Sequence, residues 1–161
     1  MILLKDILYK VTIESVVGST SVAINNLEFD SRNVSLNDVF IAIKGTVSDG
    51  HQFIKKAADQ GALAIICETL PEIIVNGITY VQVSDSHKAL AIMAANYYGN
   101  PSEELKLVGI TGTNGKTTVS SLLYQLFKKA GMETGLLSTV KIMVGDTEYK
   151  ATHTTPDSLT I

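Results

Sequence analysis

The stretch Leu107–Phe127, LVGITGTNGKTTVSSLLYQLF, combines three features that decide how we expect the chain around it to fold. Apolar residues come first, three glycines (Gly109, Gly112 and Gly115) follow, and Lys116 then opens a segment with helical spacing of apolar residues. A helix N-terminus carries a partial positive charge and free backbone N–H groups, and glycines let an anion approach them closely. The stretch therefore predicts a strand, a phosphate-binding loop and a helix over Lys116–Ala130.

The residues at the helix start predict a nucleoside triphosphate site with Mg²⁺. Lys116 is suited to neutralise the β- and γ-phosphates of ATP, and we expect it to act in catalysis, while the Thr117 hydroxyl is suited to ligate Mg²⁺. The expected ATP contacts are Gly112, Thr113, Asn114, Gly115, Lys116, Thr117 and Thr118. The common phosphate-binding loop has a glycine where Ile110 lies, so the pattern here is G-x-x-G-x-x-G-K-T-T. A glycine-rich turn without a ligand is the alternative, but packing does not explain Gly-Lys-Thr-Thr at a helix start.

After the helix, Gly131 is a helix stop, and Thr134–Val140 reads as a strand. With the strand before the loop, this predicts one βαβ unit of a P-loop ATPase domain. Lys141–Thr152 resembles a hairpin with its turn at Gly145-Asp146.

The N-terminal part alternates between strand-like and helix-like segments, which predicts an α/β fold. The expected buried strands are Val39–Ile43, Leu63–Cys67 and Thr79–Val83. A helix capped by Asp49 and stopped by Gly61 separates the first two, and a helix capped by Ser84 or Asp85 follows the third. We expect a boundary near residues 100–104, which gives one domain over 1–101 and a second over 102–161.

Composition excludes several classes of protein. The 161 residues are 45% hydrophobic and 18% charged with a net charge of −3, which fits a folded globular protein and disfavours nucleic-acid binding. The single cysteine, Cys67, rules out an internal disulfide and is expected to be a buried strand residue in a reducing compartment. No apolar run approaches the roughly 20 residues of a membrane span, so a cytoplasmic location is expected. The three histidines lack zinc-ligand spacing with Cys67.

The loop GITGTNGKTT resembles that of the Mur ligase family, which also includes the folylpolyglutamate synthases. Phe29–Ile66 resembles the N-terminal uridine-nucleotide-binding domain of the MurE and MurF branches, and Asn100–Gly131 resembles the start of their ATPase domain. A Thr-Thr-Pro segment at residues 154–156 favours the MurE branch, since MurF usually carries an asparagine-rich segment there.

This resemblance implies an ATP-dependent ligase of peptidoglycan biosynthesis. Such enzymes phosphorylate the D-glutamate carboxylate of UDP-N-acetylmuramoyl-L-alanyl-D-glutamate, and the amino group of meso-diaminopimelate or L-lysine then displaces phosphate. A MurF-type ligase that adds D-alanyl-D-alanine is one alternative. A P-loop nucleotide-binding module without ligase activity is another, from a different functional class.

The resemblance also implies that Ser31, Thr154 and Thr155 bind the UDP-substrate. Without it, Ser31 reads as a turn serine and Thr155 as an extended residue before Pro156. His51, at a helix start, is a weaker candidate for the diphosphate, and a structural role is the more usual one for such a histidine. The acidic Mg²⁺ ligand, the modified lysine and the domain that selects the amino acid have no counterpart in the chain. We therefore expect an N-terminal fragment that is inactive alone and does not decide between diaminopimelate and lysine.

Overall fold

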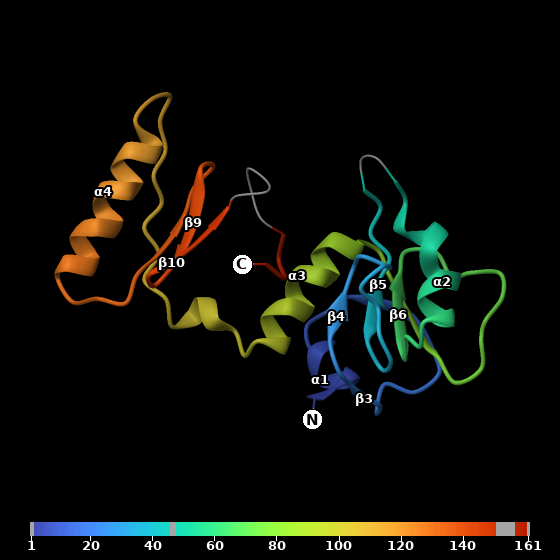
Figure 1. Ribbon diagram of the computed structural model, residues 1–161. Coiled ribbons are helices and arrows are strands. Elements are labelled where there is room, and N and C mark those ends of the chain that lie inside the picture. The colour runs from blue at the N-terminus through green and yellow to red at the C-terminus, as the bar shows by residue number, and fades with distance from the viewer. Residues whose placement is uncertain (1, 46–47, 151–156, 161) are drawn as a thin grey trace. The chain divides into compact units, whose positions relative to one another are not determined.

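The computed structural model describes residues 2–45, 48–150 and 157–160, and the chain divides into two compact units, Met1–Glu104 and Leu105–Ile161 (Figure 1). Each unit has its own sheet and its own buried cluster, so the two are described separately.

Unit 1 is built on a five-stranded sheet with the strand order β2-β7-β6-β5-β4. Its strands are β2 (Ile13–Val17), β4 (Leu27–Glu28), β5 (Val39–Ile41), β6 (Ala64–Cys67) and β7 (Thr79–Val83). Strands β4 to β7 are parallel, and β2 pairs antiparallel with β7 at one edge. The three predicted buried strands are confirmed. Strand β5 ends two residues earlier than predicted, and β6 begins one residue later.

Two helices lie on opposite sides of this sheet (Figure 1). The first, α2 (Ile54–Asp59), follows the 3-10 turn η1 (Gly50–Phe53), and the second is α3 (Ser86–Tyr97). Asp49 caps η1 by accepting a hydrogen bond from the backbone N–H of His51 at 2.9 Å, as predicted. Of the two predicted caps for the second helix, Asp85 is the one used, since its side chain accepts from the backbone N–H of Lys88 at 2.9 Å.

The shorter elements of unit 1 lie at its two ends. Near the N-terminus, β1 (Ile2–Leu3) pairs antiparallel with β3 (Ala23–Ile24), and α1 (Leu4–Ile7) contacts α3. A second 3-10 turn, η2 (Pro101–Glu103), closes the unit and occupies the region where the sequence predicts a boundary.

The centre of the sheet is buried on both faces, which is typical of parallel strands covered by helices. On one face, Phe40, Ile65 and Tyr80 pack with Ile54 and Ala57 of α2. Cys67 belongs to the same cluster and is fully buried, and this burial raises the pKa of its thiol to about 11. The interpretation of this cysteine as a buried strand residue is confirmed.

Unit 2 consists of one long helix and an antiparallel three-stranded meander. The helix α4 spans Lys116–Lys129, and the strands are β8 (Gly135–Leu137), β9 (Lys141–Val144) and β10 (Thr147–Lys150), in the order β10-β9-β8. The predicted helix is confirmed. So is the hairpin, in which Gly145 has a φ of +56° at the turn between β9 and β10.

A small cluster holds α4 on the meander. Tyr124 of α4 is buried with Leu136 of β8 and Met143 of β9. The Tyr124 hydroxyl donates a hydrogen bond to the carbonyl of Gly145 at 2.5 Å, and Lys128 forms an ion pair with Asp146 in the same turn. The helix is thus attached to the hairpin turn by polar as well as apolar contacts.

The predicted βαβ unit is not confirmed by this structure. No strand precedes the glycine loop, because residues 105–115 are irregular, and β8 pairs antiparallel with β9. Leu107 and Val108 remain 80% and 60% exposed. A strand needs a neighbour that accepts and donates its ladder hydrogen bonds, and in the described part of unit 2 the only strand partners lie within the meander.

Candidate functional site

The glycine loop of unit 2 leads directly into α4 and leaves the helix start open. Gly112 and Gly115 have φ values of +150° and +78°, a region that side chains other than glycine rarely adopt. Gly115 is the N-cap, and no side chain caps the helix. The first-turn N–H groups of this 14-residue helix therefore remain available to an anion, as the sequence predicts.

Lys116 folds back over this loop. Its Nζ donates a hydrogen bond to the carbonyl oxygen of Gly112 at 2.5 Å, and the residue is exposed. The ammonium group is therefore held against the loop at Gly112. A phosphate oxygen that approached the helix start would meet both the ammonium group and the backbone N–H groups.

The remaining loop residues differ in exposure. Thr113, Asn114 and Thr118 are exposed, whereas Thr117, in the first turn of α4, is half-buried. A threonine hydroxyl is a hard oxygen ligand of the kind that Mg²⁺ accepts, so Thr117 fits the metal role predicted for it. Within the described ranges, no three His, Cys, Asp or Glu side chains come together as a metal-binding group. Thr117 would therefore be one ligand among phosphate oxygens and water molecules.

In unit 1, Ser31 lies in a tight turn just after β4. The Asp30 carboxylate accepts hydrogen bonds from the backbone N–H of Arg32 at 2.9 Å and from its guanidinium at 2.6 to 3.0 Å. These bonds lower the pKa of Asp30 to about 2. The residue between them, Ser31, is only 6% exposed, although it sits in a turn. The Asp30–Arg32 pair thus fixes the backbone on both sides of the serine.

Ser31 belongs to the edge of the sheet at which the parallel strands end. Leu27 and Glu28 of β4 lie opposite Val39 and Phe40 of β5, so the segments after both strands leave the sheet on the same side. In parallel α/β sheets, ligands usually bind in the crevice outside these carboxyl ends. The position of Ser31 therefore agrees with a binding role, which stays a prediction.

His51 reaches the same edge, but both of its ring nitrogens already have protein partners. Nδ1 lies 2.6 Å from a carboxylate oxygen of Asp49, and Nε2 accepts a hydrogen bond from the backbone N–H of Glu68 at 2.8 Å. The side chain is 17% exposed. The structural interpretation of this histidine fits better than direct contact with a diphosphate.

Glu68, immediately after β6, is not among the residues that the sequence motifs predict for the site. Its carboxylate accepts hydrogen bonds from the backbone N–H of Ser86 at 2.9 Å and from the Ser86 hydroxyl at 2.8 Å, and these bonds lower the pKa of Glu68. The signal in the sequence is an acidic residue at the carboxyl end of a fully apolar strand, where a charge needs a nearby partner.

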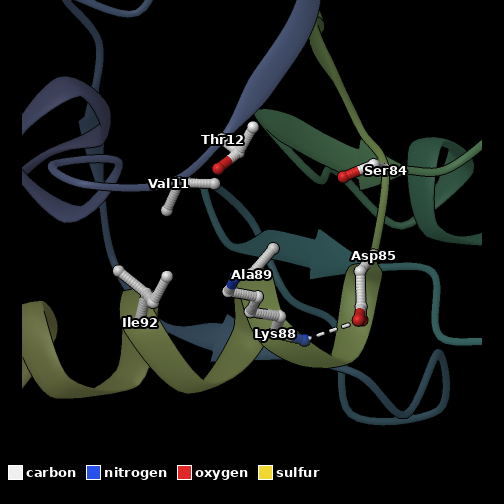
Figure 2. Close-up of a pocket in the computed structure, with 7 residues that line it drawn as sticks. All are labelled: Val11, Thr12, Ser84, Asp85, Lys88, Ala89 and Ile92. Atoms are coloured by element: carbon white, nitrogen blue, oxygen red, sulfur yellow. Dashed lines mark hydrogen bonds between the residues drawn. The ribbon is translucent and has the colours of Figure 1, made fainter.

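A small hollow lies at the same edge, next to the start of α3 (Figure 2). It has a volume of about 30 Å³ and is lined by Val11, Thr12, Ser84, Asp85, Lys88, Ala89 and Ile92. This space suits a water molecule rather than a nucleotide. The hollow includes neither Ser31 nor any residue of the glycine loop.

Two predicted substrate contacts, Thr154 and Thr155, lie outside the described residues. In the part of the chain that the structure describes, no helix is long and apolar enough to cross a membrane.

The mixed α/β sheet of unit 1 and the glycine loop at the start of α4 in unit 2 place the chain among α/β proteins of two units. The profile described as "Mur ligase family, catalytic domain" matches residues 23–98, and the profile described as "Mur ligase middle domain" matches residues 110–161. The chain belongs to the Mur ligase family.

Individual proteins of this family resemble the chain over nearly its whole length. The UDP-N-acetylmuramoyl-L-alanyl-D-glutamate--2,6-diaminopimelate ligase of Cytophaga hutchinsonii is 51% identical over 159 residues, which are 98% of this chain and 33% of that protein. The chain therefore spans about a third of the length of this relative.

Two solved structures of Mur ligases are also similar to this chain. The first is a UDP-N-acetylmuramoyl-L-alanyl-D-glutamate--2,6-diaminopimelate ligase. It is 25% identical, with a TM-score of 0.68, and the match covers 99% of this chain and 31% of that one. The other is a UDP-N-acetylmuramoylalanyl-D-glutamyl-2,6-diaminopimelate--D-alanyl-D-alanyl ligase from Acinetobacter baumannii. It is 28% identical, with a TM-score of 0.51, and the match covers 66% of this chain and 23% of that one.

Proposed function

We propose that the chain supplies the UDP-substrate unit and the ATP-binding loop of a ligase that adds diaminopimelate to UDP-N-acetylmuramoyl-L-alanyl-D-glutamate. The observation that carries the proposal is the 51% identity to a protein of that name over nearly the whole chain. Within the matched length lie the open helix start at Gly115 and the Ser31 turn, and these are the proposed sites for ATP and for the uridine nucleotide.

The reaction proceeds in two steps. The D-glutamate carboxylate attacks the γ-phosphorus of ATP, so that an acyl phosphate forms and ADP leaves. The amino group of the incoming amino acid then attacks the acyl carbon, inorganic phosphate leaves, and the nitrogen loses a proton to give the amide. Phosphoryl transfer of this kind depends mainly on positioning and on neutralising charge.

In this mechanism each residue of the loop has a defined task. The amides around Gly112, Thr113, Asn114 and Gly115 hold the phosphates, and Lys116 exchanges its bond to Gly112 for a phosphate oxygen. Thr117 would supply one oxygen ligand to Mg²⁺, and the metal would offset part of the phosphate charge. Thr118, in the first turn of α4, is the last of the proposed ATP contacts. In the Mur ligase family an acidic residue and a modified lysine complete the metal site.

The uridine nucleotide is proposed to bind unit 1 at the edge where the parallel strands end, with Ser31 as a contact. Thr154 and Thr155 are proposed to hold the sugar end of the same substrate nearer the ATP loop. The lone buried Cys67 agrees with a cytoplasmic protein, where the UDP-precursor and ATP are both available.

Three alternatives are less well supported. A ligase that adds D-alanyl-D-alanine corresponds to a relative with 28% identity and partial coverage, against 51% over nearly the whole chain. L-Lysine as the third amino acid is less well supported, because the relatives described above are diaminopimelate ligases. A nucleotide switch would ignore the UDP-sugar altogether.

Ligand-induced stabilisation tests the proposal directly. At a hundred times its dissociation constant, a ligand should add about 2.7 kcal/mol to the stability of the unit that binds it. We expect melting to rise with UDP-N-acetylmuramoyl-L-alanyl-D-glutamate and, separately, with Mg-ATP. A response to ATP alone would support the switch, and a response to neither would overturn the proposal. The 161-residue chain alone is expected to produce no ligated product.

A further inference from the structure

The hydrogen bonds of His51 define which of its ring nitrogens donates and which accepts. Nε2 accepts the backbone N–H groups of Glu68 at 2.8 Å and of Thr69 at 3.4 Å, so this nitrogen carries no proton. The ring proton therefore lies on Nδ1 and is donated to Asp49 at 2.6 Å. In this geometry the imidazole is neutral, because only one of its nitrogens can act as a donor.

These bonds join segments that follow different strands. Asp49 and His51 come after β5, and Glu68 comes directly after β6. The Glu68 carboxylate in turn accepts from the N–H and hydroxyl of Ser86, at the start of α3 after β7. A continuous polar chain thus crosses the carboxyl ends of three adjacent parallel strands.

Among the described residues, backbone hydrogen bonds also hold the segment that follows β5. Gly50 donates its N–H to the carbonyl of Ile43 at 2.8 Å, and Gly45 donates to Ser48 at 3.0 Å. A Cβ atom on Gly50 would lie 2.7 Å from the backbone of Ile43, so the chain turns back on the end of β5 at very close range. His51 is the side chain that fastens this turn to the neighbouring strand.

We propose that neutral His51 is a positioning residue for the uridine-nucleotide substrate, since it holds the turn after β5 against the end of β6. The inference rests on the proposed function, in which the substrate binds at this edge. It assigns His51 no contact with the substrate: the residue acts through the backbone that it holds.

Protonation of His51 would break the arrangement. The imidazolium would direct an Nε2–H at the N–H groups of Glu68 and Thr69, so two donors would face each other. Asp49 and the Glu68 carboxylate favour the cation, and Lys44, which lies near Asp49, opposes it. Asp85 lies near Glu68, and His87 of α3 approaches the carbonyl of Lys44 at 3.4 Å. Only the neutral ring can donate from Nδ1 to Asp49 and accept at Nε2 from the N–H of Glu68 at the same time.

The test is the affinity for UDP-N-acetylmuramoyl-L-alanyl-D-glutamate, measured by calorimetry on this chain between about pH 8 and about pH 5, where histidines ionise. The wild-type chain should lose about tenfold in affinity over this range, the equivalent of one good hydrogen bond. His51→Gln places an amide oxygen where Nε2 lies and should bind with little dependence on pH. His51→Ala should bind weakly at every pH.

The matched control is His87→Gln, which removes the other described histidine near this edge and should keep the pH dependence of the wild type. Amide hydrogen exchange at Glu68 reports the contact itself and should become faster at low pH in the wild type but not in His51→Gln. If His51→Ala binds as tightly as the wild type, the positioning role is wrong while the proposed function stands. If the wild-type chain does not bind the UDP-sugar at any pH, both are wrong.

Discussion

The Nζ atom of Lys116 lies 2.5 Å from the carbonyl oxygen of Gly112, so the side chain that follows the glycine loop bridges back across it. The two residues are separated by one loop of backbone, and their bond keeps the ammonium group beside the free N–H groups of α4. A bound phosphate would replace the carbonyl as the partner of the ammonium group, and charge-assisted bonds of this kind are stronger than neutral ones.

Lys116→Ala should remove most of the response to ATP and leave the response to the UDP-sugar unchanged. Hydrogen bonds to charged groups are worth about 1.5 to 3 kcal/mol, so the affinity for Mg-ATP should fall roughly ten- to a hundredfold. Calorimetry with each ligand measures this. Lys129→Ala, at the far end of the same helix, is the matched control, and an equal loss in both variants would exclude a specific role for Lys116.

Gly115→Ala should destabilise the start of α4. Its φ of +78° is in the left-handed region, where a side chain costs roughly 1–2 kcal/mol. No atom lies within 4 Å of a Cβ placed there, so the cost arises from the backbone and not from a clash. Gly109→Ala is the control, since its φ lies outside that region and its Cβ also meets open space. Urea unfolding of both variants should show a loss for Gly115→Ala alone.

Arg32→Ala should raise the pKa of Asp30 from about 2 toward its ordinary value of 3.8. The folded-state pKa is lower than the unfolded one, so the ionised carboxylate favours folding above about pH 4, and this contribution is lost as the pH falls toward about 2. Because Arg32 is 79% exposed, solvent screens the pair and the effect on stability should be small.

The measurement for this pair is an NMR titration of the Asp30 carboxyl carbon in both proteins. Arg32→Lys retains the charge but loses the bidentate hydrogen bonding of the guanidinium, so the pKa of Asp30 should be intermediate. An Asp30 titration that is the same in all three proteins would show that the pair does not form in solution.

Cys67 should be inert to thiol reagents in the folded chain. The thiolate is the reactive form, and a buried thiol with a pKa of about 11 provides very little of it at neutral pH. Alkylation should become fast only in denaturant, so that its rate reports unfolding of unit 1. Rapid modification of the native chain would contradict the buried position, and mass spectrometry of the product distinguishes the two outcomes.

Much of unit 1 could be predicted from short segments. Val39–Ile43 and Thr79–Val83 are apolar and β-branched, and Asp49 precedes a helix as a capping residue does, so these signals act within a few residues. In unit 2, the helix start after Gly115 and the turn at Gly145 were predictable for the same reason, because positive φ values favour glycine locally.

The apolar run at Leu107–Thr111 shows where this reasoning fails. It has the composition of a strand, but a strand also requires hydrogen-bonding partners, and β8 pairs with β9 instead. His51 is a second case: its position at a helix start was readable, whereas its bond to Glu68, 17 residues later, was not.

The sequence by itself therefore determined the glycine positions at the start of α4, the three central strands and two following helices of unit 1, and the family to which the chain belongs. These depend on residue types at close spacing, where glycine conformation, helix capping and lysine charge act locally. Only the tertiary structure decided which strands pair in unit 2, which nitrogen of His51 carries its proton and that Ser31 is buried at the end of the sheet. Those properties arise from contacts between segments far apart in the chain, and such contacts exist only once the backbone has folded.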